Sequence, residues 1–299
     1  MRSRILFAVL GVAGLSLVSA CGSSKPSGMS GMDHSAMKIP SASSPSSSHS
    51  MPGMDHGSEP MAMGDGLATT DQGFTFAPAA VTLGADGLRF QILGADGKPV
   101  TAFAPEQTKL MHFYLVRSDL TGFQHVHPTM AADGTWTAPI KQAARGSYRA
   151  YASFITKGAD GKATALVLSK QLTSPGEAKD EPLPAPSATT QVDGYTVTVD
   201  STQLMAGHAM PLKVSIARDG KPVTDLQPYL ETYAHLTGFH AGDQAMAHMH
   251  PEGAPATTDT GGPDLTFDAM LPSAGDWRLF LQFQTGGTLH TASVTLKVG

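Results

Sequence analysis

The chain has 299 residues, a formal net charge of −5 and a single cysteine. One cysteine excludes an intrachain disulfide and a zinc site built from several thiolates. It also excludes a blue-copper centre in the folded part, since the cysteine lies near the N-terminus and such a centre needs a thiolate beside two histidines. The 20 Lys and Arg residues are scattered, which argues against a nucleic-acid partner. Any metal must therefore be held by His, Met, Asp or Glu.

The N-terminus has the pattern of a secretory signal. Arg2 and Arg4 precede the apolar segment Ile5 to Val18, and small residues then lead to Cys21. The end of this segment resembles the bacterial lipobox, which implies a signal peptide at residues 1–20 and lipidation of Cys21. The alternatives are an ordinary signal peptide or a short membrane helix. No later segment has the roughly 20 apolar residues of a membrane span. We therefore expect an exported protein, lipid-anchored in the cell envelope on the outer face of the cytoplasmic membrane or facing the periplasm.

Residues 21–70 form a low-complexity segment rich in Ser, Pro, Gly and Met. Because such a composition buries too little apolar surface to offset its ordering entropy, we predict a disordered tether. Thioether sulfur suits Cu(I), whereas imidazole accepts Cu(II) and Zn(II). The tether resembles the Met/His-rich tails of bacterial copper-handling proteins; the alternative is a plain spacer. Its candidate ligands are Met29, Met32, His34, Met51, Met54 and His56.

Two later regions have the character of β-sandwiches. Short stretches rich in β-branched and aromatic residues alternate with Asp-Gly turns in residues 71–172 and again in residues 192–299. Residues 173–191 separate them and contain four prolines, which is typical of a semi-extended linker. The predicted fold class is all-β, with two tandem immunoglobulin-like β-sandwich domains after the tether.

The two regions also align with each other as copies of one unit. The sequence Asp-Gly-Lys-Pro-Val-Thr begins at Asp96 and again at Asp219, an offset of 123 residues. A competing alignment pairs residues 120–123 with residues 236–239, but it needs a gap and leaves His112 without a counterpart. We favour the ungapped alignment. It pairs His112 with His235, His125 with His248, and His127 with His250.

A His-x-His-Pro element lies at the centre of each copy. Residues i and i+2 of a strand point to the same face, so His125 and His127 could bind one ion with His112 from a neighbouring strand. Three imidazoles with an open position suit Cu(II) or Zn(II). The alternative is that these are half-buried structural histidines. Asp119, Asp243 and Glu252 are candidates to orient the rings. The full set of candidate ligands in this region is His112, His125, His127, His235, His248, His250, His290, His240, Met246 and Met249.

The segments around these elements resemble those of a known group of exported proteins. Residues 113–120 run into Gln124-His125-Val126-His127-Pro128, and Ala247-His248-Met249-His250-Pro251 follows later. The resemblance is to secreted or lipid-anchored bacterial β-sandwich proteins described as metal-binding or copper-associated lipoproteins. It implies an immunoglobulin-like or cupredoxin-like sandwich, and it implies no reaction.

Three functional hypotheses follow. The first is extracytoplasmic binding of copper, as Cu(II) at the histidines and Cu(I) at the tether, for sequestration or for delivery to another copper-handling envelope protein; zinc is the alternative ion. The second is an immunoglobulin-like interaction module whose histidines are structural. The third is a metal-dependent enzyme, which ranks last because no nucleophile, phosphate-binding loop or general base is marked by spacing. We expect a protein that is not an enzyme.

Overall fold

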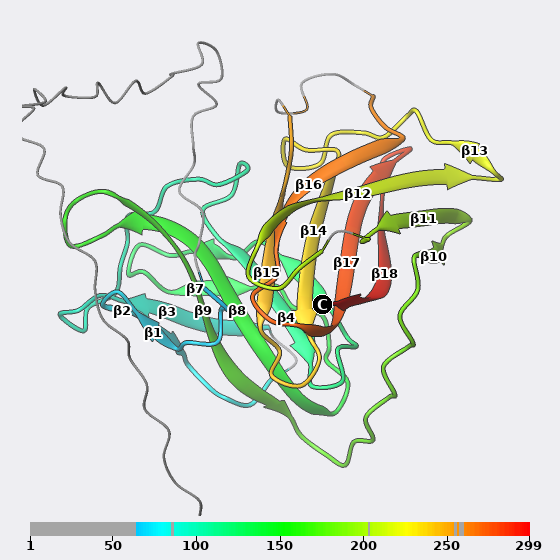
Figure 1. The fold of residues 1–299 in the computed structure, drawn as a ribbon. Helices are drawn as coiled ribbons and strands as arrows, with labels where there is room; N and C mark the ends of the chain where they lie inside the picture. Colours follow the sequence, from blue (N-terminus) through cyan, green and yellow to red (C-terminus); the bar gives the residue numbers. More distant parts are fainter. Residues whose placement is uncertain (1–63, 85–86, 203, 254–255, 257–259) are drawn as a thin grey trace, which may run out of the picture. The chain divides into compact units, whose positions relative to one another are not determined.

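The computed structural model describes residues 64–84, 87–202, 204–253, 256 and 260–299, and every regular element in them is a β-strand (Figure 1). The described residues all belong to one compact unit. The predicted signal peptide, Cys21 and the six tether ligands lie outside the described residues. A search of the described part for an apolar helix of membrane-spanning length finds none.

The first sandwich consists of two antiparallel sheets packed on an aromatic core. Phe90 stacks between Phe113 and Trp136, with ring centres 5.2 and 6.3 Å away. Strand β3 alternates fully buried residues with residues that are partly or largely exposed, as expected when one face covers the core. One sheet has the order β1 (Thr70–Asp71), β2 (Phe74–Pro78), β3 (Leu88–Leu93), β7 (Trp136–Ala138), β6 (Thr129–Met130). The other has the order β5 (Gln124–Val126), β4 (His112–Arg117), β8 (Gly146–Lys157), β9 (Ala163–Ser174).

The second sandwich repeats this plan, with one strand shared between its two halves. Strand β15 (Met246–Pro251) pairs with β14 along most of its length and with β16 at His250 and Pro251. In the first sandwich the equivalent region forms two short strands. Strand β5 pairs with β4, and β6 pairs with β7 of the other sheet. The other strands are β10 (Thr189–Val192), β11 (Tyr195–Asp200), β12 (Ala209–Arg218), β13 (Lys221–Pro222), β14 (Ala234–His240), β16 (Asp264–Met270), β17 (Gly275–Thr285) and β18 (Thr288–Val298).

Contacts between the two sandwiches explain why β4 is buried on both faces. One face of β4 covers its own core. The other face contributes Tyr114 and Val116 to a separate apolar cluster with Phe239 and Phe280 of the second sandwich. At its edge, Phe123 stacks on Phe280 with ring centres 4.2 Å apart. The Tyr151 hydroxyl also donates a hydrogen bond to the Gln244 carbonyl oxygen.

The strand pairing confirms the ungapped alignment of the two copies. Phe113 pairs with Val126, and Leu236 pairs with Met249, so both partners shift by the same 123 residues. Residues 120–123 form the turn before β5, whereas residues 236–239 lie within β14, so the competing alignment is wrong. Five predicted Asp-Gly turns are also confirmed, because their glycines have a positive φ, between 72° and 83°: Gly97, Gly134, Gly161, Gly194 and Gly220. The sixth, at residues 86–87, falls partly outside the described residues. The all-β class with tandem sandwiches is therefore correct. The segment between β9 and β10 spans residues 175–188.

Candidate metal centre

Three histidines of the first sandwich converge at one end of the β4–β5 pair. His112 begins β4, His125 lies in β5 opposite Tyr114, and His127 follows β5 directly. One ring nitrogen from each lies within 4.8 Å of the others. His112 is fully buried, and the other two are partly buried. The pairing of neighbouring strands thus brings together residues that are 13 apart in the sequence.

Hydrogen bonds at the outer nitrogens fix which atoms face the centre. His112 Nε2 donates to the carbonyl oxygen of Glu106 at 3.0 Å. His125 Nδ1 donates to Gln282 Oε1 at 2.7 Å, and the amide nitrogen of Gln282 donates to Thr291 at 3.4 Å. In the neutral rings, His112 Nδ1 and His125 Nε2 therefore carry lone pairs, and these two atoms are 3.0 Å apart.

That distance fits two ligands of one metal ion. Nitrogens bound at 2.0–2.1 Å with bond angles between 90° and tetrahedral are separated by roughly 2.9–3.4 Å. His127 adds a third candidate, because its Nε2 is buried and has no hydrogen-bond partner among the described residues. A buried nitrogen of this kind is costly unless something binds it. The donor set fits Cu(II) or Zn(II), which accept imidazole readily.

The electrostatics keep these rings neutral, which metal binding requires. Burial lowers the pKa of His125 well below its usual value, and the neighbouring His112, His127 and His235 lower it further. Burial, with His112, Lys109 and His235, lowers the pKa of His127 to about 3. Both rings are therefore uncharged at neutral pH and can act as ligands.

The second copy places its first histidine beside this group. His235 Nε2 donates to the carbonyl oxygen of Tyr229 at 2.9 Å, repeating the bond from His112 to Glu106 at the same offset. The ring centre of His235 lies 6.3 Å from that of His112 and 5.9 Å from that of His125. In β15 the backbone of His248 pairs with Thr237, and that of His250 with Asp268. The side chains of His248 and His250 lie outside the described part of the structure.

The other predicted ligands of the second copy have different surroundings. His240 Nδ1 contacts Asp243 at 2.8 Å, and its Nε2 donates to the Ala274 carbonyl oxygen at 3.1 Å. Met246 packs in the apolar cluster between the sandwiches, and Met249 packs in the core of the second sandwich. The described hydrogen bonds and ring contact of His240 lead away from the histidine group, and both methionines belong to apolar clusters.

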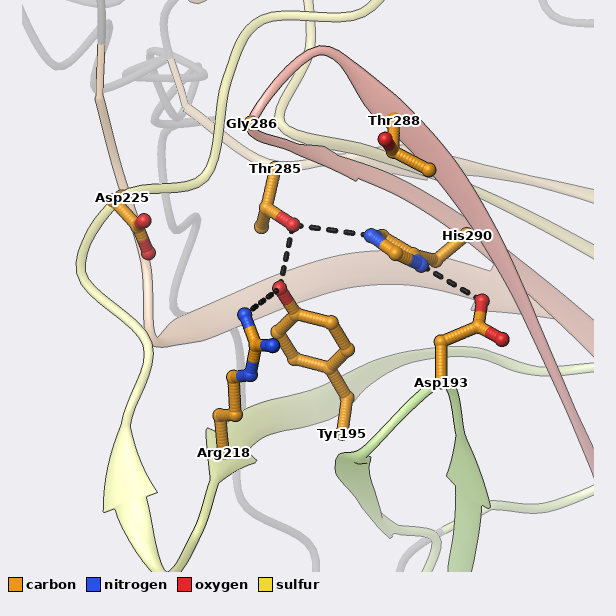
Figure 2. A pocket seen from close by; sticks show the side chains of 8 residues that line it. All are labelled: Asp193, Tyr195, Arg218, Asp225, Thr285, Gly286, Thr288 and His290. Carbon is orange, nitrogen blue, oxygen red and sulfur yellow. Dashed lines mark hydrogen bonds and ion pairs between the residues drawn. The ribbon is translucent and has the colours of Figure 1, made fainter.

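His290 belongs to a separate polar network (Figure 2). Its Nδ1 donates to Asp193 at 2.8 Å, so its Nε2 accepts from the Thr285 hydroxyl at 3.1 Å. Thr285 in turn accepts from Tyr195 at 2.6 Å, and Tyr195 accepts from Arg218 at 3.1 Å. The chain of donors runs in one direction and uses both ring nitrogens of His290. It therefore accounts for this buried histidine as a structural residue.

The groups that orient the central histidines differ from the expected carboxylates. Asp119 binds Arg117 at 2.6 Å, and Asp243 binds His240. The observed acceptors are the Glu106 carbonyl oxygen and the side chain of Gln282. The sequence gives no sign of either, because a carbonyl oxygen has no residue signature and Gln282 lies 157 residues from His125.

The neutral histidines predict acid sensitivity of the metal-free protein. A lowered folded-state pKa means that the unfolded chain binds more protons below pH 6.5, so stability falls as pH falls from 6.5 toward 3. The slope is about 1.4 kcal/mol per pH unit for each histidine that stays neutral. His127→Gln should reduce the slope by less than this, since His127 is only partly buried. Urea unfolding at several pH values measures it, and an unchanged slope in His127→Gln would contradict the prediction. His208→Gln, at an exposed position, is the control.

Comparison with known proteins identifies a family and distant structures. A family model described as "Domain of unknown function (DUF8832)" matches residues 69–169 and 190–299. No curated protein matches. A tetra-tandem repeat from the extending region of a large adhesion protein is 16% identical, with a TM-score of 0.23. The match covers 76% of this chain and 49% of the repeat protein, so our chain spans about half the length of that protein. Fibronectin(III)-like modules of Clostridium thermocellum CbhA are 12% identical, with a TM-score of 0.19. The match covers 75% of this chain and 93% of the chain of those modules. No functional conclusion follows from likenesses this distant.

Proposed function

This chain belongs to that family, whose description names no activity, and we propose from the histidine geometry that it is an extracytoplasmic metal-binding protein. One observation carries the proposal: His112 Nδ1 and His125 Nε2 face each other at 3.0 Å while their outer nitrogens are already occupied. Two facing lone pairs repel in the neutral state, and a cation bound by both removes the repulsion.

Copper is the ion we propose, with zinc as the alternative. Imidazole nitrogens without a carboxylate or thiolate are suitable ligands for Cu(II), and divalent affinity generally peaks at copper. The methionine-rich residues 21–70 supply soft thioethers suited to Cu(I). In this proposal the chain is anchored through Cys21 in the cell envelope. There it sequesters copper or delivers it to another copper-handling protein. The proposal includes no catalytic step.

The test is metal titration of the full-length chain. To remove binding by the tether, all variants carry alanine at His34, His49 and His56. Cu(II) and Zn(II) should each bind, and His125→Ala should lower the affinity by at least about 100-fold because it removes a ligand. Gln282→Ala should lower it about 10- to 100-fold, the usual effect of losing a group that orients a ligand.

His208→Ala is the matched control, because that histidine is exposed in the second sandwich. It should bind as tightly as the unsubstituted chain. Equal binding by His125→Ala and His208→Ala would overturn the proposal and favour an interaction module with structural histidines. Metal analysis of protein purified from its native envelope provides a second measurement, in which stoichiometric copper supports the proposal and a metal-free protein argues against it.

A further inference from the structure

A polar hollow of about 310 Å³ lies where β11, β12 and the β17–β18 hairpin of the second sandwich meet (Figure 2). This volume is at the lower end of the range for small-molecule sites, roughly 300–1,000 Å³. Among its lining residues, Tyr195, Thr285 and His290 are buried, and the others are exposed. None of the three histidines of the candidate metal centre lines it, so it is a separate feature of the molecule.

The first sandwich has apolar side chains at the equivalent place. Phe154 pairs with Leu166 across β8 and β9. The matching pair across β17 and β18 is Phe283 with His290, so His290 stands where the first copy has a buried leucine. A buried leucine needs no hydrogen-bond partner, whereas a buried histidine needs one for each ring nitrogen. The fold can thus be built without polar groups at this place.

The same difference is seen at the neighbouring aromatic ring. In the first copy Phe74 packs edge-on against Phe154, with ring centres 6.4 Å apart. In the second copy Tyr195 packs edge-on against Phe283, with ring centres 5.3 Å apart. Tyr195 therefore adds a hydroxyl at a position that is apolar in the first copy, and this hydroxyl contacts Arg218. The second copy carries polar groups that its fold does not require, and ligand binding accounts for them.

We propose that the hollow binds a small zwitterion of the α-amino acid type. In this proposal Arg218 holds the carboxylate of the ligand, and Asp193 and Asp225 hold its ammonium groups. The inference concerns a ligand other than the metal ion, and it does not rest on the proposed function.

Arg218 is fixed in a position that suits a carboxylate. Its Nη1 donates to the Tyr195 hydroxyl at 3.1 Å, and its guanidinium carbon lies 5.0 Å from the centre of the Tyr195 ring. The Tyr195 hydroxyl is held in turn by its bond to Thr285 at 2.6 Å. Among the described residues, Arg218 forms no ion pair with a carboxylate. Its remaining N–H groups form a planar fork that can make two parallel hydrogen bonds to a ligand carboxylate.

The acidic side chains of the hollow supply the opposite charge. Asp193 uses one carboxylate oxygen to accept from His290 at 2.8 Å, and its other oxygen accepts no described hydrogen bond. The side chain of Asp225 lines the hollow and has no hydrogen-bond or ion-pair partner in the described part of the chain. Carboxylate oxygens of this kind can accept from an ammonium group. Two carboxylates and one guanidinium therefore match a ligand that carries both signs of charge.

The same charges disfavour other classes of ligand. Two carboxylates repel phosphate and other multivalent anions, and the guanidinium of Arg218 repels a metal ion. A second hollow of about 260 Å³ beside Arg218 adds Lys221 and Asp219, whose charges cancel. The apolar face of a sugar ring finds no open aromatic face, because Tyr195 is buried under Arg218. The excess of carboxylates favours an amino acid with a cationic side chain, such as lysine.

The experiment titrates the metal-free, full-length chain with lysine and follows the backbone amide signals of Gly286 and Thr288, which line the hollow, by nuclear magnetic resonance. We expect saturable shifts with a Kd below about 1 mM. Arg218→Gln and Asp225→Asn should each weaken binding at least about 10-fold, because each loses charge-assisted hydrogen bonds. Both positions are exposed, so both variants should stay folded. Arg89→Gln, at an exposed arginine of β3, is the matched control and should bind as tightly as the unsubstituted chain.

Analogues of the probe separate its two charges. Nα-acetyllysine lacks the α-ammonium group and lysinamide lacks the carboxylate, so each should bind at least about 10-fold more weakly than lysine. Binding of both analogues as tight as that of lysine, or equal binding by Arg218→Gln and Arg89→Gln, would overturn the inference. The absence of shifts with lysine, or shifts only with glucose, inorganic phosphate or Ca²⁺, would overturn it too. None of these results bears on the metal proposal, because the metal titration reports on different side chains.

Discussion

Adding Zn(II) to the metal-free, full-length chain should raise its free energy of unfolding by about 4 kcal/mol when free zinc is 1,000 times the dissociation constant. Zn(II) is chosen because it undergoes no redox change. The proposed ligands His112 and His125 come together only when β4 and β5 pair, so we expect the folded chain to bind zinc far more tightly than the unfolded chain. For a domain of this size the gain corresponds to roughly 8–16 °C in melting temperature.

Calorimetry with increasing zinc measures this effect directly. The melting temperature should rise with the logarithm of the free zinc concentration, which is the signature of binding to the folded state. His112→Ala should abolish the rise, whereas His208→Ala should keep it. A rise of equal size in His112→Ala would show that the zinc binds at a different site in the folded chain.

The histidine triad of the first copy can be predicted from the sequence, because strand periodicity and the internal repeat are enough to identify its members. His125 and His127 share a strand face through the two-residue period, and the repeat identified His112 as their partner. The prediction needed no information on how distant segments pack. Even the two-sided burial of β4 has a signal, since Phe113 to Val116 is a continuous apolar run of the kind found in strands covered on both faces.

The remainder of the site depends on tertiary packing that no local pattern encodes. Gln282 reaches His125 only because the sandwiches pack against each other. The sequence groups His240 and His290 with the candidate ligands of the second copy, yet their hydrogen bonds to Asp243 and Asp193 place them in other networks. The identity of a hydrogen-bond partner depends on side-chain direction, and residue type alone does not fix that direction.

A buried ion pair outside the candidate metal centre should make a large contribution to the stability of the protein. Arg117 Nη1 lies 2.6 Å from Asp119 Oδ2, and the two side chains are 8% and 2% exposed. Asp119 also accepts hydrogen bonds from Thr121 and from the backbone nitrogen of Glu181 in the linker. Hydrogen bonds and the Arg117 charge lower the pKa of Asp119, although its desolvation opposes them, so the carboxylate is charged at neutral pH.

Asp119→Ala should therefore destabilise the protein by about 3–5 kcal/mol, because it leaves the Arg117 guanidinium buried without its main partner. The nearby Asp180 lies 3.5 Å from Arg117 but is 64% exposed, so it offsets little of this loss. Urea unfolding of the metal-free chain measures the change. Asp180→Ala is the matched control and should cost less than about 1 kcal/mol.

A double variant tests the cause of the loss. Arg117→Met with Asp119→Ala removes both charges and fills part of the space with an apolar side chain, so it should recover much of the stability lost in Asp119→Ala alone. No recovery would mean that the carboxylate acts chiefly through its bonds to Thr121 and Glu181, which the double variant also lacks. An effect of Asp119→Ala no larger than that of Asp180→Ala would contradict the prediction. Arg117 ends the strand that His112 begins, and its guanidinium also donates to the Lys179 carbonyl oxygen. The same ion pair therefore fixes the linker to the strand that carries His112.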